Sequence, residues 1–146
     1  YRLSHDNKAS SGPVLTLMTA IAKGESTLTA EQVTKVVDAA MDNPYRGANH
    51  RAMILSNYGL YQAQVLHSVG NAIPLMLTAG ELNPKDVLIQ INLATLALAA
   101  NRPDIAAEHL GNAVLLDTER GQHRRELATL AKQLHEQTSA PPTHPQ

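Results

Sequence analysis

The chain has 146 residues, which is enough for one domain with a hydrophobic core, and its 12 basic and 13 acidic side chains nearly cancel. This balance argues against nucleic acid as a partner, because a protein that binds it electrostatically needs a basic surface. The chain has no cysteine, which excludes disulfides, thiolate metal ligands and cysteine nucleophiles. Aromatic residues are only 3% of the chain, whereas the strong helix formers alanine and leucine are abundant.

The first two helices are expected within residues 11–44, after a polar and aperiodic segment, 1–10, that is expected to fray. The apolar residues of the first helix recur at helical spacing, and Pro13 falls in its first turn. Thr29 and Gln32 have the three-residue spacing of a capping box, which predicts the start of the second helix. That helix ends at an Asn-Pro step, because a residue before proline is disfavoured in the helical region.

Five more helices follow from the spacing of apolar residues and from the residues that begin and end helices. Asp86 is placed to cap one of them, and Pro103 to occupy the first turn of the next. The apolar run 87–100 is shorter than the roughly 20 residues of a membrane span, so it predicts a buried helix and no insertion into a membrane. The expected ranges are about 51–66, a helix that ends at 82 and has Pro74 in its first turn, then 87–100, 103–116 and about 122–137.

No segment shows a sustained period of two, so the predicted fold class is all-α, with about seven helices in antiparallel hairpins. Small residues recur at a fixed spacing of 34, which indicates equivalent positions where two helices of a hairpin approach closely. The recurring residues are Ala72 and Ala106, Ala79 and Ala113, and the series Ala63, Ala97 and Ala131.

Residues 87–120 resemble one complete tetratricopeptide repeat, a family of paired helices with a 34-residue period. Leu93 and Ala94 match the large-small pair of the first helix, and Ala106 and Ala113 match the alanines of the second. The resemblance implies a short right-handed solenoid of stacked helical hairpins.

The implied solenoid forms a single domain over residues 11–137. Its parts are a divergent helix pair at 11–44, repeats at 51–86 and 87–120, and a capping helix at 121–137, followed by a disordered tail at 138–146. The sequence departs from the family pattern because no large aromatic residue opens either first helix, Ala97 stands where tyrosine is common, and Thr118 replaces the closing proline.

A second resemblance concerns the arrangement of the whole chain. A divergent helix pair ending in "DNPYR", two degenerate repeats and a short polar tail are similar to the C-terminal tails of some bacterial polytopic membrane proteins. These include O-antigen-ligase-like and oligosaccharyltransferase-like enzymes of glycan transfer. This resemblance implies an extracytoplasmic (periplasmic) position, whereas a tetratricopeptide scaffold without membrane spans is expected in the cytoplasm.

The motifs of catalysis and metal binding are missing from the sequence. None of the histidines are spaced i,i+3 or i,i+4, as two ligands on one helical face require. No Gly-rich phosphate loop occurs, and Ser56 lies in no nucleophile-elbow motif. We therefore expect no catalytic residue, metal or cofactor in these residues, and the question of an enzymatic parent protein stays open. The histidines are His5, His50, His67, His109, His123, His135 and His144.

In tetratricopeptide repeats the first helix of each unit lines a concave surface, so the resemblance implies where a peptide would bind. The implied contacts are Asn57, Tyr61, Gln64, Leu88, Asn92, Thr95, Arg125 and Thr129. Asparagine side chains there can hydrogen-bond an extended peptide, and tyrosine offers an amphipathic contact. The alternative is that so short a groove binds nothing and that several of these side chains pack against the N-terminal helix pair.

Three functions agree with these observations. The first is a non-catalytic protein–protein interaction or scaffold module, which binds a protein or peptide segment or the rest of its parent chain. The second is an accessory domain of a membrane-embedded glycan-transfer enzyme. The third is self-association through an exposed end of the repeat array. The sequence predicts no particular oligomeric state.

Overall fold

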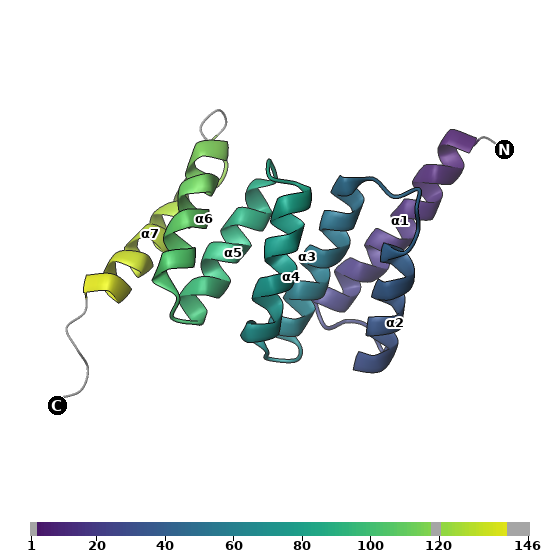
Figure 1. Cartoon of the computed structure of the whole chain (residues 1–146), viewed down its shortest axis with the longest axis horizontal. Coiled ribbons are helices and arrows are strands. Elements are labelled where there is room, and N and C mark those ends of the chain that lie inside the picture. The colour runs from purple at the N-terminus through teal and green to yellow at the C-terminus, as the bar shows by residue number, and fades with distance from the viewer. Residues whose placement is uncertain (1–2, 118–120, 140–146) are drawn as a thin grey trace. The chain divides into compact units, whose positions relative to one another are not determined.

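The computed structural model of the chain describes residues 3–117 and 121–139, which form helices joined by short connections (Figure 1). The all-α class and the seven helices are confirmed, and no strand occurs in these described residues. The predicted disordered tail lies outside them except for its first two residues, which end the last helix. The helices are α1 (Leu3–Ala22), α2 (Ala30–Met41), α3 (Ala48–Gln64), α4 (Val69–Leu82), α5 (Val87–Ala99), α6 (Pro103–Leu116) and α7 (Arg124–Ser139).

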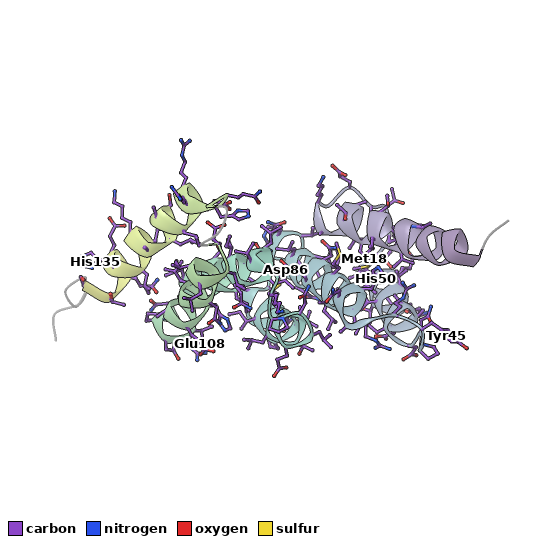
Figure 2. All side chains as sticks on the ribbon, turned by 90° about the horizontal axis from the view of Figure 1, so that it is seen from above. Met18, Tyr45, His50, Asp86, Glu108 and His135 are labelled. Atoms are coloured by element: carbon purple, nitrogen blue, oxygen red, sulfur yellow. The ribbon has the colours of Figure 1, made fainter. Side chains whose placement is uncertain are left out.

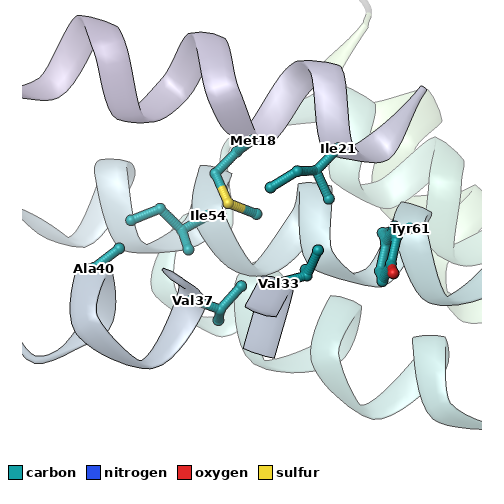
Figure 3. Close-up of a cluster of buried hydrophobic side chains, with 7 residues drawn as sticks. All are labelled: Met18, Ile21, Val33, Val37, Ala40, Ile54 and Tyr61. Atoms are coloured by element: carbon teal, nitrogen blue, oxygen red, sulfur yellow. The ribbon is translucent and has the colours of Figure 1, made fainter. Parts of the chain in front are cut away.

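The chain forms two compact units, Tyr1–Pro84 and Lys85–Gln146, which are described separately. In the first unit α3 is the central helix, because α1, α2 and α4 all pack against it. Figure 3 shows side chains from α1 and α2 pointing toward one another beside α3. This buried cluster consists of Met18, Ile21, Val33, Val37, Ala40, Ile54 and Tyr61.

The predicted capping box at the start of α2 is confirmed. The backbone N–H of Gln32 donates to Thr29 Oγ1 at 3.2 Å, and the backbone N–H of Thr29 donates to Gln32 Oε1 at 2.9 Å. These two bonds satisfy donors that the first turn of a helix leaves without partners.

Two prolines lie deeper in their helices than the sequence suggested. The first helix begins at Leu3 and not at residue 11, so Pro13 lies in its interior. Likewise α4 begins at Val69, which places Pro74 in its second turn. No glycine or proline precedes Gly12, so no local signal stops the helix from extending toward the N-terminus.

In the second unit α5, α6 and α7 pack against one another in all three combinations. As predicted, Asp86 caps α5, because its Oδ1 accepts from the backbone N–H of Leu88 at 2.9 Å and of Ile89 at 3.4 Å. The start of α6 at Pro103 is also confirmed. The buried cluster of this unit consists of Ile91, Ala94, Leu110, Ala113, Leu127 and Leu130.

The recurring alanines are packing positions. Ala72, Ala79, Ala106 and Ala113 are almost completely buried, as the 34-residue spacing predicted. In the first unit Gly59 of α3 lies so close to α4 that an added Cβ would be 3.4 Å from the carbonyl oxygen of Ala72. The other series is not uniform, since Ala97 is buried, Ala63 is half-buried and Ala131 is exposed.

Replacing Ala106 by leucine should overpack the α5–α6 interface and lower the free energy of unfolding by about 1–3 kcal/mol. The neighbouring Ala107 is exposed, so Ala107→Leu is the matched control and should leave stability nearly unchanged. Urea unfolding followed by helical circular dichroism measures both variants. Equal stability of the two leucine variants would contradict the packing role of Ala106.

The end of α5 depends on a left-handed residue. The backbone N–H of Arg102 donates to the Ala97 carbonyl at 2.7 Å, and that of Asn101 to the Leu98 carbonyl at 3.1 Å, which together form a Schellman motif. Asn101 has a φ of 57°, a conformation that asparagine tolerates better than most residues with a side chain.

Because alanine is strained in this conformation, Asn101→Ala should destabilise the protein by about 1 kcal/mol. Asn101→Gly should be at least as stable as the wild type, since glycine adopts a positive φ freely. Thermal melting of the two variants side by side tests this order, and an alanine variant as stable as the glycine variant would exclude the left-handed cap.

Candidate interaction surface

Three of the eight predicted contact residues form one exposed strip on α5. Leu88, Asn92 and Thr95 follow each other at spacings of four and three, so they lie on the same side of the helix. Leu88 is 52% exposed, Thr95 is exposed and Asn92 is half-buried. The Thr95 hydroxyl donates to the Ile91 carbonyl at 2.9 Å. The methyl group and an oxygen lone pair of Thr95 remain able to contact a ligand. We call these three residues the α5 strip.

The α5 strip is uncharged because α5 contains no ionisable residue between Val87 and Ala99. The other sides of the helix are buried: Ile91 and Ala94 belong to the cluster shared with α6 and α7, and Leu93 and Ala97 are fully covered. A ligand of the strip would therefore meet one aliphatic side chain, one amide and one hydroxyl, and no charge.

Arg125 and Thr129 lie on a different surface. Leu127 and Leu130 are the side chains of α7 that are buried in the unit's core. At 100° per residue, Arg125 and Thr129 are each about 160° around the helix from Leu127. Both are exposed, and the Thr129 hydroxyl donates to the Arg125 carbonyl at 3.0 Å. The structure therefore does not bring these two residues together with the α5 strip.

The three remaining predicted contacts belong to α3 in the first unit. Asn57 is half-buried and Gln64 is exposed, but Tyr61 is only 6% exposed and belongs to the buried cluster. Its ring stacks on that of Tyr58, with ring centroids 6.4 Å apart. Tyr61 therefore packs in the core of the first unit, as the alternative interpretation of the sequence predicted, and is not a surface contact.

A polar cluster of two buried side chains and one exposed side chain links α5 to α6, and the sequence patterns did not reveal it. Gln90 is 4% exposed and His109 is 8% exposed, with Gln90 Oε1 and His109 Nδ1 2.7 Å apart. The side-chain amide of Asn112 also donates to Gln90 Oε1, at 3.2 Å. Because that oxygen can only accept, the proton of the histidine ring lies on Nδ1. We call Gln90, His109 and Asn112 the polar cluster.

The surroundings of His109 determine the protonation state of its imidazole. Burial lowers the pKa of His109 below its ordinary value of 6.5, and the carboxylate of Glu108 opposes this shift. Glu108 Oε2 lies 3.9 Å from His109 Nε2. The Glu108 side chain, labelled in Figure 2, is 71% exposed, so solvent screens its charge. The imidazole is therefore neutral at pH 7 and donates one hydrogen bond to Gln90.

In residues 3–117 and 121–139, no group of three or more His, Asp or Glu side chains is placed to hold a metal ion. None of the helices described is both long and apolar enough to cross a membrane. No match to the chain was found among protein-family models, curated proteins or solved structures.

Replacing Gln90 by leucine should lower the free energy of unfolding by about 1–3 kcal/mol, because the buried N–H of His109 loses its acceptor. The double variant Gln90→Leu with His109→Leu should recover part of that loss, since both polar partners are then gone. The exposed Gln133 of α7 provides the control Gln133→Leu. A double-mutant cycle from urea unfolding measures the coupling, and strict additivity would exclude the hydrogen bond as a stabilising contact.

Proposed function

We propose that this chain is a non-catalytic protein–protein interaction or scaffold module built from tetratricopeptide-like helical hairpins. The observation that carries the proposal is the α5 strip, an uncharged row of two exposed residues and one half-buried residue on a helix whose other sides are buried. The ligand proposed is a protein or peptide segment, which can belong to the rest of the parent chain.

The chemistry of the α5 strip suits an extended peptide. The amide of Asn92 supplies both donors and an acceptor, which can pair with the backbone N–H and C=O of one residue in an extended peptide. The exposed half of Leu88 can cover an apolar side chain of the same peptide. Both side chains stand on a helix fixed by packing, so little conformational entropy is lost when they bind.

The resemblance to tetratricopeptide repeats is supported by the burial pattern. Ala106 and Ala113 are the family-matching alanines of the second helix, and both are buried within the unit in which α5 and α6 pack together. Leu93 and Ala94, the matching pair of the first helix, are buried completely. The membrane-protein tail and self-association stay predictions from the sequence, and no contact described here favours either of them.

Selection of random linear peptides displayed on phage tests the proposal, because no partner has to be known in advance. Peptides enriched on the wild-type protein should bind the Leu88→Ala, Asn92→Ala double variant roughly tenfold more weakly. The matched control is the Arg125→Ala, Thr129→Ala double variant, which alters the exposed side of α7 and should bind like the wild type.

Circular dichroism of both double variants must show unchanged helicity, so that weaker binding reports on the surface. Failure to enrich any peptide, or equal affinity of the Leu88→Ala, Asn92→Ala variant, would contradict the proposal. Loss of binding in the α7 control alone would move the contact surface from α5 to α7.

A further inference from the structure

Gln90, the member of the polar cluster that lies on α5, and the α5 strip are on opposite sides of that helix. Gln90 lies two residues after Leu88 and two before Asn92, which places it about 160° around the helix from each. Its oxygen accepts hydrogen bonds from two side chains of α6. The inward contact of Gln90 with His109 therefore helps to fix the rotation of α5 and the direction in which the strip faces.

We propose that His109 makes the α5–α6 contact sensitive to pH, so that its protonation loosens α5 against α6 and weakens the surface that α5 presents. The effect on ligand binding depends on the proposed function, whereas the loosening itself does not. The geometric basis is one almost completely buried imidazole between two helices. Its Nδ1–H is bound to Gln90, so a second proton would go to Nε2, where the exposed Glu108 carboxylate at 3.9 Å is the recorded charged partner.

The charges around His109 offer little compensation for protonation. No ionisable group lies on α5, and on α6 only Glu108 is recorded within ion-pair distance of the ring among the described residues. Two other acids of this region are engaged elsewhere: Asp104 of α6 pairs with Arg102, and the carboxylate of Asp117, which directly follows α6, accepts from the backbone N–H of His123.

The charged groups of α7, the other helix that packs against α6, also lie away from His109. His123, which directly precedes α7, pairs with Glu126, with Nδ1 and Oε1 2.9 Å apart. The remaining ionisable side chains of α7 are exposed, and none is recorded in an ion pair with His109. They are Arg124, Arg125, Lys132, His135 and Glu136.

The direction of the effect follows from proton linkage. Since burial places the pKa of folded His109 below 6.5, the loosened chain binds a proton at higher pH than the packed one. The stability contributed by neutral His109 is therefore complete above pH 6.5 and is lost as the pH falls below it.

Hydrogen–deuterium exchange tests the loosening directly, without any ligand. After correction for intrinsic exchange rates, wild-type amides of α5 and α6 should lose protection between about pH 7.5 and about pH 5.5. Amides of α3 and α4 serve as the internal reference. His109→Gln, which keeps a donor but cannot be charged, should remove this loss, whereas His135→Gln on the exposed side of α7 should retain it.

A second variant keeps the test decisive if His109→Gln folds poorly. Glu108→Gln changes an exposed side chain and removes the one nearby anion, so it should enlarge the loss of protection at low pH. Unchanged wild-type protection at low pH, or a loss that persists in His109→Gln, would overturn the proposal, as would a Glu108→Gln variant identical to the wild type. Where peptides bind, their affinity should fall at low pH for the wild type but not for His109→Gln. Absence of peptide binding would refute the proposed function, but it would not change the result of the exchange experiment.

Discussion

The close approach of paired helices through small side chains is the constraint on which both units depend. In α4 and α6 the contact positions are alanines, and Gly59 of α3 lies against the backbone of α4. Helices joined in this way bury few methyl groups at the contact itself, so each pair gains little from the hydrophobic effect alone. The larger apolar side chains are supplied by further helices: Met18 and Ile21 by α1 in the first unit, and Leu127 and Leu130 by α7 in the second.

Because α5 is buried on most of its sides, each of its polar groups that lacks a hydrogen-bond partner would lower the stability of the fold. Gln90 finds two partners on α6, and the first N–H groups of the helix find the carboxylate of Asp86. At its other end the side-chain amide of Gln137 donates to the Leu98 carbonyl at 3.0 Å, which connects the last turn of α5 to α7. Both neighbours of α5 in this unit thus contribute a hydrogen bond as well as apolar contacts.

Features that depend on a few neighbouring residues could be predicted from the sequence. Thr29, Asp86 and Pro103 mark helix starts correctly, because a cap or a first-turn proline acts within three residues of itself. The buried alanines followed from a period that recurs along the chain. The predicted start of α1 was wrong because no glycine or proline marks the true start. Nothing in the neighbouring sequence distinguishes a polar segment that is helical from one that is frayed.

Features that depend on how a helix is rotated about its axis could not be predicted. The candidate contacts were transferred by resemblance, which named residues on the outward side of α5 but also assigned Tyr61 to a surface although it lies in a core. Arg125 and Thr129 were also assigned to the contact surface by resemblance, and they face away from the buried side of α7. The pairing of Gln90 with His109 joins residues on different helices, and no sequence spacing specifies which polar side chains of two helices will meet.

The polar cluster gives α5 a property that its apolar contacts do not supply. The apolar contacts of side chains such as Ala94 and Ala97 are non-directional, so they do not by themselves specify which polar groups of two helices meet. A buried amide with two defined donors is satisfied in only one arrangement. The same cluster therefore selects one rotation of α5, directs Leu88 and Asn92 outward, and makes that arrangement depend on the protonation of a single imidazole.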